Sequence, residues 1–363
     1  MPSQDASSRL IRVVVADDSA FMRTALTRMI ESDPGLRVSG TAQTGVEALE
    51  KVNFLQPDVV TLDVEMPGMN GLEALRRIMK ESPRPVIMVS SLTREGAETT
   101  LEALASGAFD YVPKQSSFVA LDIVKIREDL IAKIKAAAES GRRRQPSGRV
   151  AQVAATPPKT AARRALHITP TVVALGTSTG GPKALQEILP LLPADLPVGV
   201  LIVQHMPLGF TAPFARRLDD LCQVSVREAE NDALIEPGVV YIAPAGQHMT
   251  VYRHTPAQYA IRLSHTPEKT LHTPSVDVMM RSVAETFHAA AMGVIMTGMG
   301  SDGLEGMRAI VHEGGVTLGQ DEASCAVYGM PRACAENGIL HKVVSLPRIP
   351  EQILQATQYR PKH

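Results

Sequence analysis

Along the first 140 residues, short apolar runs alternate with segments of helical periodicity. The apolar runs predict β-strands at 11–18, 36–42, 58–65, 85–91 and 109–114. Apolar residues spaced three or four positions apart predict helices at 20–30, 44–52, 71–80, 97–107 and 121–138. Five strand–helix units in this order predict a parallel sheet covered by helices on both faces, an α/β fold.

The same alternation resumes near residue 170. Strands are predicted at 171–176, 198–206, 223–229, 238–244 and 290–298, and helices at 183–192, 211–221, 275–289 and 303–313. Two further runs, 248–254 and 258–265, predict a β-hairpin inserted into this second domain. We therefore expect two α/β domains, each a mainly parallel, doubly wound sheet.

A basic stretch separates the two halves. Residues 141–165 carry seven basic and no acidic side chains and lack an apolar period, which predicts an exposed linker. We place the domains at 10–137 and 169–355, with the linker at 138–168. Each flanking half carries a net charge of −4, so neither offers the basic surface that nucleic acid requires.

The composition points to a cytoplasmic protein. Aromatic residues make up 4% of the chain and Trp is absent, so the cores must be aliphatic and rich in Met. We find neither a membrane-spanning apolar run nor the layout of a signal peptide. Three cysteines, Cys222, Cys325 and Cys334, are few and odd in number, as is typical of reduced thiols.

Five polar side chains are expected at one edge of the first sheet. They follow or end predicted strands: Asp17, Asp18, Asp63, Ser90 and Lys114. The carboxyl ends of parallel strands meet at one edge, where ligands bind. Clustered carboxylates favour Mg²⁺, and a metal-flanked Asp63 is suited to accept a phosphoryl group. Lys114 would then pair with the new charge, and Ser90 would bond a phosphoryl oxygen.

The motifs around these residues resemble the receiver domain of two-component response regulators. They read VVVADDSAFMR, DVVTLDVEMPGMNGLEAL, VIMVSSLT and YVPK. The resemblance covers residues 10–137 and implies a flavodoxin-like fold, phosphorylation at Asp63, and Mg²⁺ held by Asp17, Asp18 and Asp63.

The resemblance also implies roles for residues at the last two strands. Ser90 and Lys114 would form the sensing pair, and Tyr111 falls at the switch-aromatic position. One position departs from the family. Gln115 follows Lys114 where the family usually has Pro, so we expect Lys114 to be aimed differently.

The segment GTSTGGPK, residues 176–183, contains a Gly-x-Ser-x-Gly pattern centred on Ser178. A strand before it and a helix after it predict a nucleophile elbow, with helix amides available to an oxyanion. Pro182 suits the first helical turn. The alternatives are a plain helix entry or a phosphate-cradling loop, although GxGxxG and the ending GK[ST] are both missing.

A serine nucleophile needs a base, and His205 is the preferred one. It lies near the end of the strand at 198–206, at the sheet edge expected for Ser178. Four histidines compete but fall in hairpin or loop segments, where surface positions are expected: His248, His254, His265 and His272.

Asp302 is the preferred acid because it lies between the strand at 290–298 and the next helix. With Glu305 it would also form a capping box at that helix. The chain order Ser–His–Asp differs from the Ser–Asp–His order of α/β-hydrolases, so that fold is not implied.

The second half resembles the CheB family of protein-glutamate methylesterases in bacterial chemotaxis. The matching segments are LGTSTGGPKAL, IVQHMPLGFTAPFARRL, YIAPAGQHM, HTPSVDVMMRSVA, MTGMGSDGLEGM and GGVTLGQDEASCAVYGMP. The resemblance implies a catalytic triad of Ser178, His205 and Asp302. It also implies the backbone amides of Thr179 and Met299 as oxyanion donors.

The implied activity is phosphorylation-gated hydrolysis of glutamate methyl esters, with deamidation of glutamine, on chemoreceptors. The esterase reaction would need no cofactor. The implied partners are methyl-accepting chemoreceptors as substrate and the chemotaxis histidine kinase as phosphodonor, with neither nucleic acid nor membrane insertion. The alternatives are a DNA-binding response regulator, a nucleotide-binding α/β domain, and an inactive scaffold that binds receptors.

Overall fold

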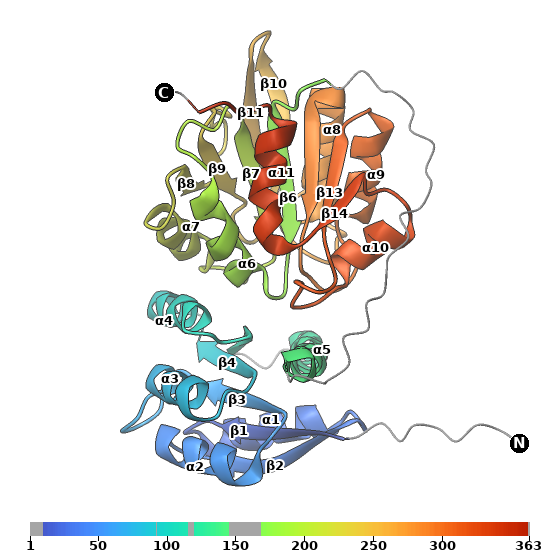
Figure 1. Cartoon of the computed structure of the whole chain (residues 1–363). Coiled ribbons are helices and arrows are strands. Elements are labelled where there is room, and N and C mark those ends of the chain that lie inside the picture. The colour runs from blue at the N-terminus through green and yellow to red at the C-terminus, as the bar shows by residue number, and fades with distance from the viewer. Residues whose placement is uncertain (1–9, 92, 115–119, 145–167, 362–363) are drawn as a thin grey trace, which may run out of the picture.

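The computed structural model describes residues 10–91, 93–114, 120–144 and 168–361. They form two α/β domains, drawn in Figure 1 as a lower body in blue to teal and an upper body in green to red. The main sheet of each domain is wholly parallel. The predicted fold class is confirmed.

The N-terminal domain is a five-stranded sheet with strand order β2-β1-β3-β4-β5. Its elements are β1 (Ile11–Ala16), α1 (Ala20–Glu31), β2 (Leu36–Ala42), α2 (Gly45–Leu55), β3 (Val59–Asp63), α3 (Gly71–Glu81), β4 (Val86–Ser91), α4 (Arg94–Ala105), β5 (Asp110–Lys114) and α5 (Ala120–Arg144). One core cluster lies under α1 and α5, and another lies under α2, α3 and α4. The chain thus buries both faces of the sheet, as its apolar strands predict.

Local capping explains why the helices of this domain begin where they do. Ser19 accepts a hydrogen bond from the Met22 amide at the start of α1. Asn70 does the same for the Glu73 amide at the start of α3. Each cap satisfies one of the amides that a helix start leaves unpaired. Strand and helix are therefore separated by short polar turns at the carboxyl edge of the sheet.

The C-terminal domain is a seven-stranded sheet with strand order β14-β13-β12-β6-β7-β9-β8. Its elements are β6 (Val172–Thr177), α6 (Gly181–Ile188), β7 (Gly199–Gln204), α7 (Thr211–Asp219), β8 (Ser225–Glu228), β9 (Val239–Ile242), β10 (His248–Thr255), β11 (Gln258–Ser264), α8 (Val276–Phe287), β12 (Ala291–Ile295), α9 (Leu304–His312), β13 (Val316–Gln320), α10 (Met330–Glu336), β14 (Lys342–Val344) and α11 (Ile349–Ala356). Strands β10 and β11 pair antiparallel as the predicted hairpin. The central strand β6 is buried along its whole length, which explains its unbroken apolar sequence.

Four elements of this domain carry no clear signal in the sequence. Strand β14 has only three residues and β13 follows two glycines, so neither builds a recognisable apolar run. Helices α10 and α11 have seven and eight residues, too few for a period of 3.6 to show. Their positions come from packing against the sheet instead.

The structure describes only part of the predicted linker at 138–168. Helix α5 continues to Arg144, so the first part of the predicted linker is helical. The rest of that linker, residues 145–167, lies outside the described residues. Gln115, the position that departs from the receiver pattern, also lies outside them.

The two domains meet through α4 and β5 of the first and α6 and α7 of the second. Figure 1 shows α4 opposite α6 and α7. The Tyr111 ring on β5 stacks on Phe210, just before α7, with centroids 5.1 Å apart and planes 5° apart. Glu98 on α4 lies 3.6 Å from Arg216 on α7. A cleft of about 870 Å³ separates other parts of the two surfaces, so the domains touch over only part of their facing area.

Among the residues that the structure describes, no helix combines the length and the apolar character that a membrane crossing requires.

Candidate active site

The carboxylate of Asp302 holds the His205 ring by a direct hydrogen bond. His205 follows the last residue of β7, and its Nε2 lies 2.9 Å from Asp302 Oδ2. Both side chains are largely buried, at 9% and 11% exposure. Beside an ionised carboxylate, Nε2 carries the proton and donates it. The lone pair of the ring therefore lies on Nδ1, the atom that a general base would use.

The carboxylate of Asp302 accepts further hydrogen bonds from the start of α8. Oδ2 accepts from the Val276 amide at 2.8 Å, and Oδ1 accepts from the Asp277 amide at 3.0 Å and the Ser275 hydroxyl at 2.9 Å. Burial opposes the charge, yet the His205 hydrogen bond and these amides lower the pKa of Asp302 to about 2. Asp302 therefore stays ionised and fixed in place.

This arrangement corrects the predicted capping box. Helix α9 starts at Leu304, with Gly303 at its cap position and no side-chain cap there. Its start is bound instead by Asp277 of α8, whose Oδ1 accepts from the amides of Gly303 at 2.9 Å and Gly306 at 2.7 Å. Asp302 caps α8 and Asp277 caps α9, so each helix start is satisfied by a carboxylate from the other segment.

Ser178 lies beside His205 at the carboxyl edge of the sheet. Thr177 of β6 pairs with Gln204 of β7, and Ser178 and His205 are the next residues on these two strands. The His205 amide donates to the Thr177 carbonyl at 3.2 Å. The Gln204 side-chain amide donates to the carbonyls of Ser178 at 3.0 Å and His205 at 2.9 Å, and so bridges the two segments.

Gln204 was not recognised from the sequence as part of the site. Its signal was present, because a polar amide closes the otherwise apolar run VGVLIVQ. The side chain is buried, at 2% exposure, and a buried amide needs polar partners. The two carbonyls at the edge supply acceptors for its N–H groups.

The glycines after Ser178 shape a tight turn. Gly180 has a φ of 74°, in the left-handed region that favours glycine, and the Gly181 amide donates to the Ser178 carbonyl at 2.8 Å. Pro182 falls in the first turn of α6, as predicted. Among the described residues, neither the Thr179 amide nor the Met299 amide donates a hydrogen bond to a backbone carbonyl. Thr297 links their loops through its hydroxyl, which donates to the Thr179 carbonyl.

The competing histidines do not all lie where the sequence places them. His254, His265 and His272 are exposed, as expected. His248 is wholly buried, which corrects its predicted surface position, and its Nδ1 accepts from the Ser275 amide. His272 stacks on His205 with ring centroids 3.9 Å apart. Loop 265–275 has no apolar period, so its sequence gave no sign of this contact.

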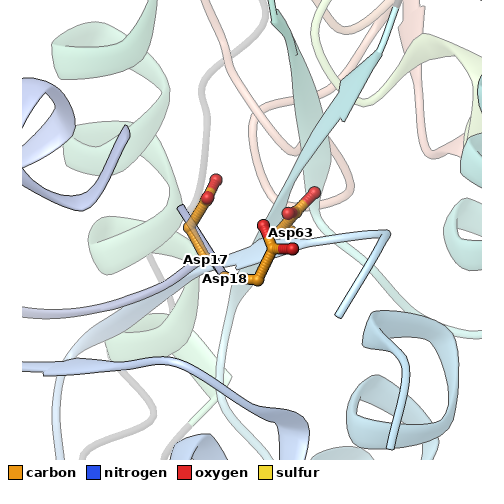
Figure 2. A group of neighbouring side chains, drawn as sticks. All are labelled: Asp17, Asp18 and Asp63. Atoms are coloured by element: carbon orange, nitrogen blue, oxygen red, sulfur yellow. The ribbon is translucent and has the colours of Figure 1, made fainter. Parts of the chain in front are cut away.

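The predicted polar cluster of the N-terminal domain is assembled at the edge of its sheet. Figure 2 shows Asp17, Asp18 and Asp63 gathered there. One carboxylate oxygen from each of them lies within 4.8 Å of the other two. Lys114 Nζ lies 2.9 Å from Asp17 and 2.6 Å from Asp63. Burial, partly offset by Lys114, raises the pKa of Asp63 to about 6. Three converging carboxylates fit a hard divalent cation such as Mg²⁺.

Ser90 and Tyr111 connect this edge to the domain interface. The buried Ser90 hydroxyl donates to the Gly96 carbonyl of α4 at 3.1 Å rather than facing Asp63. Tyr111 is buried against Phe210 of the other domain. Next to it, burial raises the pKa of Asp110, while Lys133 and the amides of Tyr111 and Gly180 act against that shift. Phe109, next to β5, and Gly180 of the glycine turn line the same cleft between the domains.

Comparisons with known proteins identify both domains. Residues 13–124 match the family model of the response regulator receiver domain, and residues 173–353 match that of the CheB methylesterase. A protein-glutamate methylesterase/protein-glutamine glutaminase of Oleidesulfovibrio alaskensis is 48% identical, covering 96% of this chain and 99% of that protein. The chain belongs to the CheB methylesterase family.

Two further relatives agree with this assignment. A protein of the same name from Pyrococcus abyssi is 46% identical over 97% of this chain and 95% of its own length. The crystal structure of the Thermotoga maritima CheB methylesterase catalytic domain is 35% identical, with a TM-score of 0.50. It covers 52% of this chain and 99% of that domain. The DNA-binding, nucleotide-binding and scaffold alternatives find no support among these relatives.

Proposed function

We propose that this CheB family member hydrolyses glutamate methyl esters, and deamidates glutamine, on methyl-accepting chemoreceptors during adaptation in bacterial chemotaxis. The observation that carries the proposal is the hydrogen-bonded His205–Asp302 pair beside Ser178 at a shared sheet edge. The names of relatives that match almost the whole chain support the substrate class.

In the proposed reaction, Ser178 is the nucleophile and His205 is the base. Nδ1 of His205 takes the hydroxyl proton while Oγ bonds to the ester carbonyl carbon, and the carbonyl electrons move onto its oxygen. The amides of Thr179 and Met299 stabilise this oxyanion. Asp302 stabilises the charged imidazole through its hydrogen bond with Nε2.

Collapse of the intermediate breaks the bond to the methoxy oxygen, which leaves as methanol with the proton from His205. Water then gives a proton to His205 and attacks the acyl-enzyme, which releases glutamate and restores Ser178. With a glutamine side chain, the same steps release ammonia in place of methanol. Ester and amide pass through similar tetrahedral intermediates, which supports both activities at one site.

A methanol-release assay on membranes with methylated chemoreceptors tests this proposal. Ser178→Ala is expected to lower turnover by about three orders of magnitude or more, because the nucleophile is lost. Ser225→Ala removes an exposed hydroxyl on β8 and is expected to match the parent protein. Undiminished methanol release by Ser178→Ala would rule out this serine.

We further propose that the receiver domain gates the esterase site and is phosphorylated at Asp63. Asp17, Asp18 and Asp63 would hold Mg²⁺, which when bound neutralises charge during phosphoryl transfer. The chemotaxis histidine kinase would supply the phosphoryl group. Lys114 would pair with the phosphoryl charge, because its ammonium already contacts Asp63 at 2.6 Å.

Contacts at the interface support gating. Tyr111 stacks on Phe210, and Glu98 of α4 lies 3.6 Å from Arg216 of α7. In this arrangement the receiver stands beside the esterase site. A phosphoryl-driven turn of Ser90 away from Gly96 would alter α4, which faces α6 and α7. The small and odd number of cysteines supports the cytoplasm as the expected compartment.

A further inference from the structure

The peptide that joins Ser178 to Thr179 carries one of the two amides proposed to hold the oxyanion. It is a trans peptide, so its carbonyl and its N–H lie in one plane and point in opposite directions. Among the described residues, the Thr179 N–H donates to no backbone carbonyl. Whatever holds the Ser178 carbonyl therefore also sets the direction of the Thr179 N–H.

Two donors hold the Ser178 carbonyl. The Gly181 amide donates to it at 2.8 Å within the glycine turn, and the Gln204 side-chain Nε2 donates to it at 3.0 Å from the end of β7. The same Nε2 also donates to the His205 carbonyl at 2.9 Å. One buried amide thus ties the peptide of the proposed nucleophile to the backbone of the proposed base.

The Gln204 side chain is fixed in one orientation. It is only 2% exposed, and its Oε1 lies against Gly181, where any Cβ would overlap it. Exchanging the nitrogen and the oxygen would turn Oε1 towards two carbonyl oxygens, which are also acceptors. Within the described chain, Oε1 itself has no hydrogen-bond partner. An apolar side chain of similar size would avoid that cost to stability.

Thr297 holds the neighbouring peptide rather than this one. Its hydroxyl donates to the Thr179 carbonyl at 2.9 Å, which belongs to the peptide between Thr179 and Gly180. Its carbonyl accepts from the Ser178 amide at 3.0 Å, which belongs to the peptide before Ser178. Gln204 is therefore the side chain that acts on the peptide bearing the Thr179 N–H.

We propose that Gln204 is a positioning residue of the esterase reaction, whose amide holds the Ser178 carbonyl so that the Thr179 N–H points at the developing oxyanion. This inference rests on the proposed function. The hydrogen bonds of Nε2 go to two backbone carbonyls, so Gln204 acts through the Ser178–Thr179 peptide and not on the substrate.

Substitutions with apolar residues test this role. Gln204→Leu and Gln204→Met remove the donors and keep a side chain of similar size. Gln352→Leu is the matched control, because Gln352 is also a buried glutamine of this domain, 6% exposed, and its Oε1 accepts from Lys342 at a distance from the site residues in sequence and structure. Each variant is made in the full chain, and its thermal unfolding midpoint is measured alongside activity.

We expect Gln204→Leu to lower kcat for methanol release by about 10- to 100-fold with KM changed by less than about twofold, because the misdirected amide is needed only in the transition state. Gln352→Leu should keep the kcat of the parent protein. Equal kcat for Gln204→Leu and Gln352→Leu would overturn the proposal, as would a loss confined to KM. If Gln204→Leu fails to fold, Gln204→Met is judged by the same criteria, and loss of folding by both would show a structural role instead.

The direction of the amide is visible in crystal structures of the phosphonyl adducts of the parent protein and Gln204→Leu. The phosphonyl oxygen should lie within hydrogen-bond reach of the Thr179 nitrogen in the parent, and beyond about 3.5 Å in Gln204→Leu. The same contact in both adducts would overturn the positioning role.

Labelling of Ser178 by a fluorophosphonate probe, followed by mass spectrometry, keeps the test independent of the receptor substrate. The labelling rate of Gln204→Leu should fall below those of the parent protein and Gln352→Leu. If the parent labels at Ser178 but releases no methanol, the proposed function fails while these rates still decide the role of Gln204. Equal labelling rates for Gln204→Leu and the parent would overturn the positioning role alone.

Discussion

At the scale of single residues, Asp302 combines its proposed catalytic role with a structural one. Its two oxygens accept hydrogen bonds from the His205 ring, the Ser275 hydroxyl and two amides at the start of α8. A buried carboxylate with this many donors is stabilised in its charged form. The charge that orients the base therefore also stabilises the fold.

The pKa of Asp302 gives a prediction about stability and pH. The pKa of Asp302 is lowered from 3.8 to about 2 in the folded protein, so its ionised carboxylate stabilises the folded state at pH values above 3.8. This contribution is lost as the pH falls through about 2. Asp302→Asn should therefore unfold more easily by about 2 kcal/mol at pH 5, with the difference shrinking towards pH 2. Urea unfolding of both proteins between pH 5 and pH 2 measures this difference in the free energy of unfolding.

Asp220→Asn is the matched control for this change, because Asp220 is exposed at the end of α7. Its free energy of unfolding should run parallel to that of the parent protein at every pH. A constant difference between Asp302→Asn and the parent from pH 5 to pH 2 would contradict the stabilising role of the Asp302 charge.

Strand ends were enough to predict where the main side chains gather. Ser178 and Asp302 follow predicted strands and His205 lies near the end of one, and parallel strands bring such positions to one edge. His272 and Asp277 were beyond this reasoning. His272 lies in a loop without periodicity, and the contact of Asp277 with α9 depends on how two helices pack.

At the scale of elements, α8 and α9 begin side by side and exchange carboxylates. Asp302, before α9, accepts from amides of α8, and Asp277, in α8, accepts from amides of α9. The start of a helix carries a partial positive charge, so each carboxylate lies where its negative charge stabilises the neighbouring helix. The exchange couples the position of the catalytic acid to the packing of two helices.

Replacing Asp277 tests this exchange. Asp277→Ala leaves the Gly303 and Gly306 amides without their acceptor, and should lower the free energy of unfolding by about 1–2 kcal/mol. Glu305→Ala removes the exposed partner of the capping box predicted from the sequence, and should cost less than about 0.5 kcal/mol. Urea midpoints of the two variants compare the caps. A larger loss for Glu305→Ala would favour the capping box.

The longer elements could be predicted and the shortest could not. Strands such as β1 and β6 are recognisable because most of their residues are apolar, and the hairpin is recognisable from its two runs with a short turn. Strand β14 and helix α10 are stabilised by neighbours distant in sequence, so their own residues carry little signal. The sequence pattern alone therefore predicts the seven-stranded sheet without β13 and β14, the two strands at one of its edges.

At the scale of the whole molecule, the receiver and esterase domains meet through a small set of contacts. The Tyr111–Phe210 stack and the Glu98–Arg216 pair lie beside a cleft of about 870 Å³. The exposed ion pair contributes little, whereas buried apolar residues of α4, β5, α6 and α7 belong to one core cluster that includes both domains. A modest change at α4 is thus able to shift the balance between closed and open arrangements.

Phosphorylation should shift that balance through Asp63. With acetyl phosphate and Mg²⁺, methanol release by the parent protein should rise by about tenfold or more, as a closed population opens. Asp63→Asn should show no rise, because no acyl phosphate can form. Glu73→Gln, an exposed substitution on α3, should respond like the parent. A full response by Asp63→Asn would contradict the gating proposal.

The central claim is that Ser178, His205 and Asp302 act together, and a crystal structure of the protein after reaction with a fluorophosphonate tests it most directly. The account predicts phosphorus bonded to Ser178 Oγ, a phosphonyl oxygen against the Thr179 and Met299 amides, and His205 Nδ1 within hydrogen-bond reach of the adduct. An adduct on another residue, or a His205 ring turned away from Ser178 beyond contact, would contradict it.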